Sequence, residues 1–327
     1  MILVAGGTGI LGTHLVPRLA QRGYPVRVLT RDPARARNLS ELGVEVVCGD
    51  VRDRHSVAKA LDGAGTVISA VHGFAGPGGV SPASVDRAGN AHLIGAAARA
   101  GCAFVLVSVV GAAPAHPIGL FQEKHAAEQM LRASCLPWTI VRATAFMETW
   151  GSIMSGMLTA SGKILVFGRG NNRINFVSAA DVAALIEQAV IDPGLRGQVL
   201  QIGGPANLTF NQVAGMVQEA TGRAGTVRHV PRPVLHAISA LAGAVKPALA
   251  RQARAALAMD TLDMTFDPNP ARQAFPGLPN TDMPAALKQL LTCCREAQQR
   301  DNPRTAPRRL DTQPSQEQAP GTRWSRG

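Results

Sequence analysis

Short apolar runs alternate with amphipathic stretches through the first 150 residues of the chain. The apolar runs are rich in Val, Ile and Leu, and they predict strands at residues 2–5, 26–30, 44–48, 66–71, 103–109 and 138–142. The stretches between them have helical periodicity and are long enough to connect neighbouring strands. Because parallel strands need such crossover connections, the pattern predicts a doubly wound parallel sheet of the α/β class.

The alternation becomes less regular after residue 143, and this divides the chain into three predicted parts. Residues 1–143 are expected to form a Rossmann-type domain, and residues 144–299 a smaller substrate lobe together with late elements of the sheet. The later elements are a helix at 179–190, a strand at 198–202 and a helix at 209–221. Residues 300–327 are rich in Arg, Pro, Gln and Ser without an apolar stripe, which predicts a disordered basic tail.

Residues 234–245 form an apolar stretch that is shorter than the roughly 20 residues needed to span a bilayer. This stretch is expected to be a core or interface helix, and no membrane association is expected. The first predicted strand follows Met1 directly, which leaves no room for a signal peptide. The five cysteines show no pairing pattern, so we expect reduced thiols and a cytoplasmic protein. No spacing typical of a zinc site occurs, and no metal is expected.

The 327-residue chain carries a formal charge of +11, and 28 of its 33 basic residues are arginine. These arginines are scattered along the chain, and only 4% of the residues are aromatic. A nucleic-acid groove normally shows a clustered basic patch, so we expect no nucleic-acid partner. The composition indicates an ordinary globular protein. We expect a small-molecule substrate as its partner and leave the oligomeric state open, with a homodimer as one alternative.

The most specific motif is a glycine-rich turn that follows the first strand and opens a helix. It comprises Gly6, Gly7, Thr8, Gly9, Ile10, Leu11 and Gly12. Glycines allow a tight turn and a close approach to a pyrophosphate, whose charge is met by free N–H groups and the positive end of the helix. A purely structural turn is the alternative, and the P-loop lysine is missing. The motif therefore predicts an NAD(P)-binding domain over residues 1–143.

The end of the second predicted strand indicates which coenzyme is bound. An acidic residue there would bind the ribose 2′-hydroxyl of NAD(H), but the strand ends in Thr30 and Arg31, followed by Arg35 and Arg37. Guanidinium groups suit a 2′-phosphate, so NADP(H) is favoured and NAD(H) is the less favoured alternative. Asp32 partly opposes this interpretation.

These motifs, together with Gly49-Asp50, residues 107–111 and Lys124 before the Trp138-Thr139-Ile140 segment, resemble the atypical short-chain dehydrogenase/reductases. Within that family the chain is similar to the NmrA-like and isoflavone-reductase-like branch over about residues 1–235. The resemblance implies that Asp50 contacts the adenine, and Val51 beside it is expected to bind the cofactor as well. It also implies that Ser69, Ala70, Val71 and Lys124 lie at the nicotinamide half of the cofactor.

Two residues are candidates for catalysis. Lys124 lies at the edge of an apolar helix stripe, where it can transfer a proton or hold the ribose, and the alternative is a surface pair with Glu128. Ser108 follows a strand and can bond a substrate carbonyl, although such serines also form turns. The tyrosine that reductases of the superfamily place four residues before the lysine is replaced by Leu120. Its absence favours acceptors whose anion is delocalised.

Asp86 and Asn90 share an apolar helix face with Leu93, Ile94 and Ala97. Buried polar groups need partners, so these two residues either order a water molecule or the active-site strand, or serve helix packing.

The leading interpretation is an NADPH-dependent oxidoreductase that transfers hydride to a small conjugated or quinone-like substrate. The alternative is a non-catalytic NADP-binding sensor, regulator or assembly factor, as the resembling branch also contains such proteins. Sugar-nucleotide epimerisation normally needs the missing tyrosine and is disfavoured.

Overall fold

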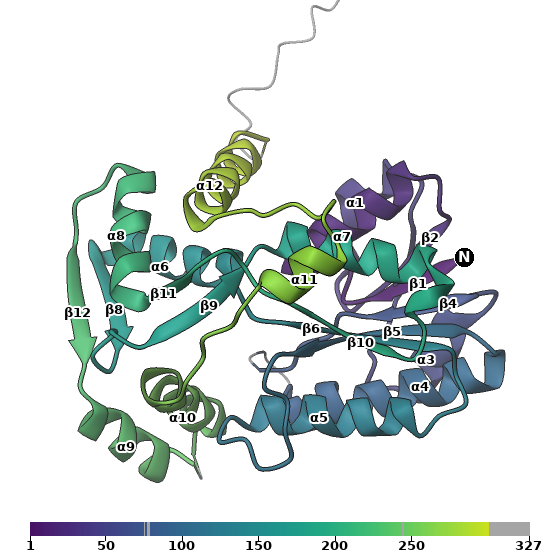
Figure 1. Cartoon of the computed structure of the whole chain (residues 1–327), viewed down its shortest axis with the longest axis horizontal. Coiled ribbons are helices and arrows are strands. Elements are labelled where there is room, and N and C mark those ends of the chain that lie inside the picture. The colour runs from purple at the N-terminus through teal and green to yellow at the C-terminus, as the bar shows by residue number, and fades with distance from the viewer. Residues whose placement is uncertain (75, 77–78, 244, 301–327) are drawn as a thin grey trace, which may run out of the picture.

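A seven-stranded parallel sheet dominates the computed structural model, which describes residues 1–74, 76, 79–243 and 245–300 (Figure 1). The strand order is β10-β6-β5-β4-β1-β2-β3. The strands are β1 (Ile2–Ala5), β2 (Val26–Thr30), β3 (Glu45–Cys48), β4 (Thr66–Ser69), β5 (Ala103–Val109), β6 (Trp138–Ala143) and β10 (Gln198–Ile202). The strand order reverses between β1 and β4, and α/β sheets open a ligand crevice at the carboxyl ends of such strands.

Helices cover both faces of this sheet and bury their apolar sides against it (Figure 1). One face carries α1 (Ile10–Gln21) and α7 (Ala179–Ile191), which pack together over β1, β5 and β6. The other carries α3 (Arg54–Leu61), α4 (Ala88–Ala100) and α5 (Gly119–Arg132). Shorter helical turns are η1 (Pro33–Ala36), α2 (Arg37–Ser40), η3 (Pro193–Leu195) and the π-helical η2 (Ala83–Arg87). The result is the three-layer arrangement expected of an α/β protein.

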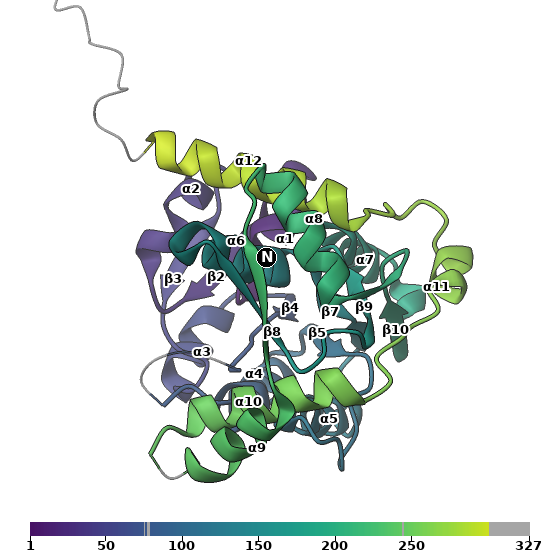
Figure 2. The ribbon, with the colours of Figure 1, turned by 90° about the vertical axis from the view of Figure 1, so that its left-hand side faces the viewer.

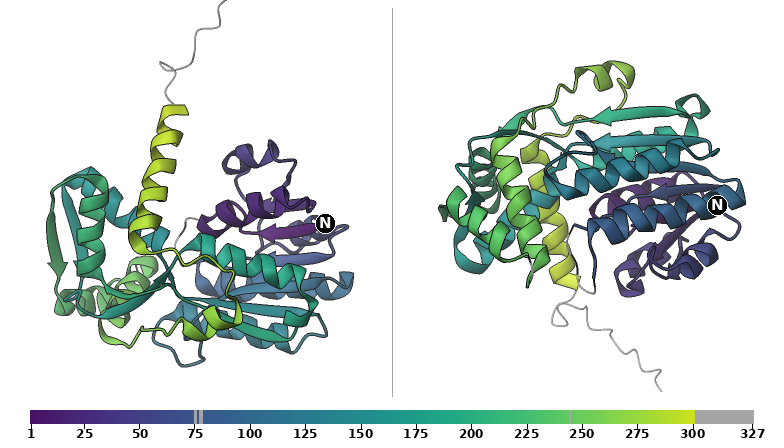
Figure 3. Two further views of the ribbon diagram at one scale, coloured as in Figure 1. Left: turned by 45° about the horizontal axis from the view of Figure 1, so that its top comes forward. Right: turned by 90° about the horizontal axis from the view of Figure 1, so that it is seen from below.

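A second lobe lies at the carboxyl ends of the parallel strands (Figures 1 and 3). Its strands form two small sheets, β11-β9-β7 and β12-β8. The elements are β7 (Ala145–Phe146), α6 (Met147–Ser161), β8 (Lys163–Phe167), β9 (Arg173–Val177), β11 (Asn207–Thr209), α8 (Phe210–Thr221), β12 (Thr226–Val230), α9 (Arg232–Leu241), α10 (Pro247–Thr261) and α12 (Met283–Arg300). A separate apolar core joins α6, α8 and α12, and α12 lies across α6 and α8 (Figure 2). The short α11 (Asn269–Ala274) contacts β10.

The predicted fold class is confirmed, and the predicted strands agree with the structure within two residues. The core interpretation of residues 234–245 is wrong, because α9 buries Leu235 alone and Leu241 is 80% exposed. The predicted tail beyond residue 300 lies outside the described residues. Within the described ranges, every helix is too short or too polar to cross a bilayer.

Candidate functional site

The glycine-rich turn joins β1 to α1 at the carboxyl edge of the sheet. Gly6 has a φ of +91°, and a Cβ there would lie 2.5 Å from the carbonyl oxygen of Ala70. A Cβ on Gly12 would lie 2.3 Å from the carbonyl carbon of Gly7. Both positions therefore require glycine, which lets the strand, the turn and the helix approach closely. This close approach of bare backbone fits a dinucleotide pyrophosphate.

The N-terminus of α1 is open to an anion. Gly9 is the N-cap and offers no side-chain cap, and the first turn of the helix contains no acidic residue. The first N–H groups of a helix lack intrahelical acceptors, and the helix dipole places partial positive charge there. Of the predicted residues 6–12, Gly6, Thr8, Gly9 and Ile10 are at least partly exposed along this turn, whereas Gly7, Leu11 and Gly12 are buried beneath it.

Arginine side chains border the turn on the side of β2. Arg35 Nη2 donates a hydrogen bond to the Thr8 carbonyl oxygen at 3.2 Å, and the hydroxyl groups of Thr8 and Thr30 lie 3.2 Å apart. Arg31 is exposed at the end of β2. The Asp32 carboxylate instead accepts a hydrogen bond from the backbone N–H of Ala34 at 3.0 Å, where it caps η1. Cationic groups therefore outnumber the acid at this end of the strand.

Asp50 follows β3 and is paired with Arg52. Its carboxylate accepts hydrogen bonds from the Arg52 backbone N–H at 2.9 Å and from Nη2 at 2.7 Å. Burial raises the pKa of Asp50, but these bonds and the charges of Arg52 and Arg31 outweigh it and hold the pKa below the ordinary value. Val51 was predicted to contact the cofactor. Its side chain is buried against Gly89 of α4, so any contact of Val51 with a cofactor would have to come from its backbone.

Lys124 is buried at the ends of β4 and β5, with 3% of its surface exposed. Its Nζ donates hydrogen bonds to the carbonyl oxygens of Val71 and Val107, both at 2.9 Å, and lies 3.0 Å from Asp86 Oδ1. Two N–H donors of the ammonium group are thus hydrogen-bonded, and the contact with Asp86 Oδ1 is an ion pair in which that oxygen accepts no hydrogen bond. The alternative of a surface pair with Glu128 is wrong, because Lys124 and Glu128 face different partners.

Asp86 and Asn90 form hydrogen bonds to residues at the end of β4, which agrees with the prediction that they order this strand. Asp86 Oδ2 accepts a hydrogen bond from the Gly73 N–H at 2.8 Å. The Ser69 hydroxyl donates to Asn90 Oδ1 at 2.6 Å, and Asn90 Nδ2 donates to the Asp86 carbonyl oxygen at 2.6 Å. Asp86 lies in the π-helical turn η2, an irregularity that is frequent at functional sites.

Ser108 belongs to a second buried network. Its hydroxyl donates to Glu128 Oε1 at 2.5 Å, and Arg142 donates to both oxygens of the same carboxylate. The hydrogen bonds that Arg142 donates to Glu128, partly offset by burial, raise the pKa of Arg142. Ser108 is 2% exposed, so the predicted bond to a substrate carbonyl is not available in this arrangement.

His72 was not singled out from the sequence, although it directly follows the strand-end residues that were. The residue is exposed to solvent. The ring stacks loosely on Phe74, with the centroids 6.1 Å apart. The available signal was its position immediately after residues 69–71, which the sequence predicted to lie at the nicotinamide half of the cofactor.

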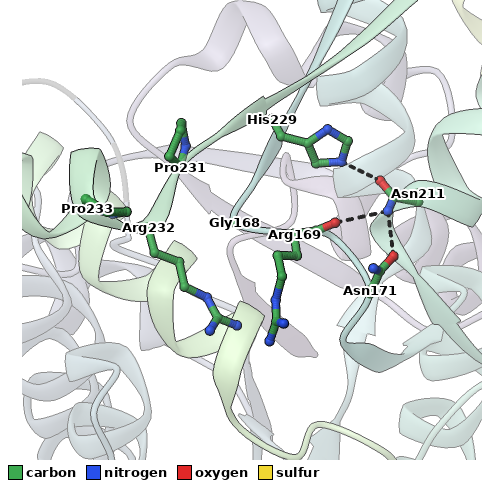
Figure 4. A pocket seen from close by; sticks show the side chains of 8 residues that line it. All are labelled: Gly168, Arg169, Asn171, Asn211, His229, Pro231, Arg232 and Pro233. Atoms are coloured by element: carbon green, nitrogen blue, oxygen red, sulfur yellow. Dashed lines mark hydrogen bonds between the residues drawn. The ribbon is translucent and has the colours of Figure 1, made fainter.

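A separate pocket of about 720 Å³ lies in the second lobe (Figure 4). Arg232 Nε donates to Asp260 Oδ2 at 2.5 Å, and Asp260 Oδ1 accepts from the Arg169 backbone N–H at 3.1 Å. Asn211 donates to the Arg169 carbonyl oxygen and bonds to His229 Nε2 at 2.9 Å. The pocket is lined by Gly168, Arg169, Asn171, Asn211, His229, Pro231, Arg232 and Pro233, so it shares no residue with the glycine turn.

The NmrA-like family profile matches residues 1–266. The chain is 31% identical over 249 residues to an NAD(P)H azoreductase from Xenophilus azovorans, covering 76% of this chain and 82% of that protein. It is 30% identical over 247 residues to the phenylcoumaran benzylic ether reductase Pyrc5 of Pyrus communis, covering 72% and 79%. The solved structure of an Escherichia coli NADPH-dependent quinone oxidoreductase complexed with NADPH is also similar, with a TM-score of 0.69 and 22% sequence identity. The match covers 89% of this chain and 100% of that one, and it confirms the fold.

Proposed function

The chain belongs to the NmrA-like family, and on that premise we propose that it is an NADPH-dependent oxidoreductase that reduces a small conjugated or quinone-like acceptor. The observation that carries this proposal is the uncapped glycine turn with arginine side chains beside it. The sequence similarity to an NAD(P)H azoreductase and to a benzylic ether reductase supports the same reaction class.

NADP(H) is the proposed cofactor. Its pyrophosphate would bind the backbone of residues 6–12, and its 2′-phosphate would lie beside Arg31 and Arg35. Asp50 would contact the adenine, and residues 69–71 would line the nicotinamide half. When bound, the nicotinamide ring supplies the hydride.

A conjugated acceptor suits a site that lacks the tyrosine. Leu120, four residues before Lys124, is buried and offers no proton. A positioned acid contributes about 10²–10⁴ in rate where a localised anion must be protonated. A quinone, an azo group or an enone spreads the charge over several atoms after hydride transfer, so it depends less on that acid. The azoreductase similarity supports an N=N acceptor in particular.

Lys124 and Asp86 are proposed to hold the ends of β4 and β5 in position beside the cofactor. A direct catalytic role of Lys124 would require the release of at least one of its three contacts. Ser108 is proposed to act indirectly, through Glu128 and Arg142, on the shape of the same edge of the sheet.

The test is NADPH oxidation with a panel of acceptors: a naphthoquinone, an azo dye, an enone and, as the matched control, a simple ketone. We expect turnover of conjugated acceptors and none of the simple ketone. NADPH binding without turnover of any acceptor would contradict the oxidoreductase proposal.

The burial of Lys124 and its ion pair with Asp86 favour a second candidate, a non-catalytic sensor or regulator that binds NADP(H). Such a protein needs the glycine turn and the arginines but no proton donor. It would bind NADPH with normal affinity in a fluorescence titration and leave every acceptor unreduced.

A further inference from the structure

We propose that His72 is the proton donor of this reduction and protonates the acceptor as the hydride is transferred. The inference deepens the proposed oxidoreductase function and rests on it. It supplies the acid that the missing tyrosine would otherwise provide.

The backbone on both sides of His72 is fixed. The carbonyl oxygen of the preceding Val71 accepts a hydrogen bond from Lys124 Nζ at 2.9 Å, and the N–H of the following Gly73 donates to Asp86 Oδ2 at 2.8 Å. These buried contacts come from α5 and η2, so two helical elements determine where the His72 side chain begins. A side chain on such a fixed segment meets the geometric demand on a proton donor.

This segment also lies against the proposed cofactor site. Ala70, two residues before His72, approaches Gly6 so closely that a Cβ on Gly6 would lie 2.5 Å from the Ala70 carbonyl oxygen. The glycine turn and the segment that carries His72 are therefore in contact. A cofactor bound along the turn would pass the end of β4, and the exposed His72, three residues after that strand, would meet the acceptor there.

The neighbouring polar groups are poor alternatives because their hydrogen bonds are already used. Lys124 donates to two carbonyl groups and is ion-paired with the buried Asp86, and Ser69 and Ser108 donate to Asn90 and Glu128. No hydrogen bond of the His72 ring occurs among the described residues, and the ring is open to solvent. It can therefore both donate a proton and be reprotonated by water.

The proposed step balances as follows. The C–H bond of the reduced nicotinamide breaks, and its hydride forms a bond to one end of the conjugated C=C, C=O or N=N system. The electron pair of that system moves to the other end, which takes the proton of the His72 imidazolium. The acceptor gains two electrons, the cofactor loses two, and the neutral imidazole regains a proton from solvent.

The charged groups around His72 give this step a recognisable pH dependence. Burial lowers the pKa of His72 from 6.5, Asp86 of η2 opposes the shift, and Lys124 of α5 lowers the pKa further. A donor must carry its proton, so kcat/KM for the acceptor should fall as pH rises through this lowered pKa, below pH 6.5.

The variant His72→Gln tests the proposal, because glutamine keeps a polar side chain but does not titrate. We expect kcat/KM for a quinone at acidic pH to fall about 10²-fold, the lower end of the effect of a positioned acid, and the pH dependence to disappear. NADPH affinity and thermal stability should remain unchanged. Equal rates in both proteins, or the same pH dependence in His72→Gln, would overturn the assignment.

Two further histidine variants test whether the expected effect is specific to His72. His55→Gln, on the exposed start of α3, is the matched control and should leave the pH profile intact. His116→Gln tests a rival donor, because His116 stacks on Phe121 with centroids 4.2 Å apart and its Nδ1 accepts a bond from the Ile118 N–H. If His116→Gln removes the pH dependence and His72→Gln does not, the inference is wrong.

A nuclear magnetic resonance titration of the protein without ligands provides a readout independent of turnover. The imidazole signal that is absent from His72→Gln should titrate below pH 6.5, and titration above that value would contradict the environment described. NADPH binding without reduction of any acceptor would refute the proposed function and the inference together. Turnover that His72→Gln leaves unchanged would refute the inference alone.

Discussion

Replacing Lys124 with methionine should destabilise the fold strongly, whatever its effect on activity. Methionine approximates the length of the lysine side chain and removes its charge and its three N–H donors. Asp86, which is fully buried, would keep the Gly73 N–H but lose its counter-charge. The carbonyl oxygens of Val71 and Val107 would lose a donor at the same time.

The expected loss is about 3–5 kcal/mol, the usual effect of removing one partner of a buried ion pair. This is a large part of the roughly 5–15 kcal/mol that stabilises an ordinary protein. Loss of activity in a Lys124 variant would therefore not identify Lys124 as a catalytic acid, because the ends of β4 and β5 would be disturbed as well. Replacing Lys124 with alanine would disturb the same strand ends and would also leave a cavity.

The assay is urea unfolding of the ligand-free protein, followed by tryptophan fluorescence and circular dichroism to verify a single transition. The double variant Lys124→Met/Asp86→Asn should recover part of the loss, because no unpaired buried charge remains. Lys59→Met, at an exposed position of α3, is the matched control and should change stability by less than about 0.5 kcal/mol. If Lys124→Met unfolds at the same urea concentration as the wild type, the buried pair does not have the assigned role.

Three other changes test other parts of the site. Gly6→Ala should abolish NADPH binding in a fluorescence titration, because its Cβ would clash with the Ala70 carbonyl oxygen. Unchanged binding would contradict the proposed binding of the pyrophosphate by the glycine-rich turn. Arg31→Ala should weaken NADPH binding about 10- to 100-fold and leave NADH binding unchanged, because a charge-assisted contact contributes about 1.5–3 kcal/mol; equal loss for both coenzymes would exclude a 2′-phosphate contact. Asp50→Asn should lower stability by about 1 kcal/mol at neutral pH. The pKa of Asp50 is lower in the folded protein than the unfolded value near 3.8. Its contribution to stability is therefore present above pH 3.8 and is lost as the pH falls through the folded pKa. Chemical unfolding at neutral and at acidic pH should show that the stability difference between the wild type and Asp50→Asn becomes smaller in acid.

The sheet and the glycine turn were predictable because both depend on local sequence. Apolar runs of four to seven residues define each strand, and the turn needs glycine wherever a Cβ would meet backbone atoms, as at Gly6 and Gly12. The sequence also placed Asp86 and Asn90 on an apolar face, where buried polar groups must find partners.

The choice of partners was less predictable, because it depends on contacts between elements distant in the chain. Helical spacing left a pair between Lys124 and Glu128 open as an alternative, yet these side chains reach Asp86 and Arg142 respectively. The parallel pair of β8 and β12 joins residues about sixty positions apart, so no local pattern indicates it. His72 stands outside any periodic pattern, and only the fold shows that its backbone is held on both sides.

The position of β10 at the edge of the main sheet has a consequence for synthesis of the protein. β10 pairs with β6, but the chain first builds much of the second lobe and α7 before it returns. A nascent chain that has left the ribosome only as far as Ala143 would expose the unpaired edge of β6. It would also expose the apolar side of α1, which α7 covers in the complete protein. We therefore expect truncation after Ala143 to give an aggregating fragment, and translation must pass Ile202 before the sheet can close.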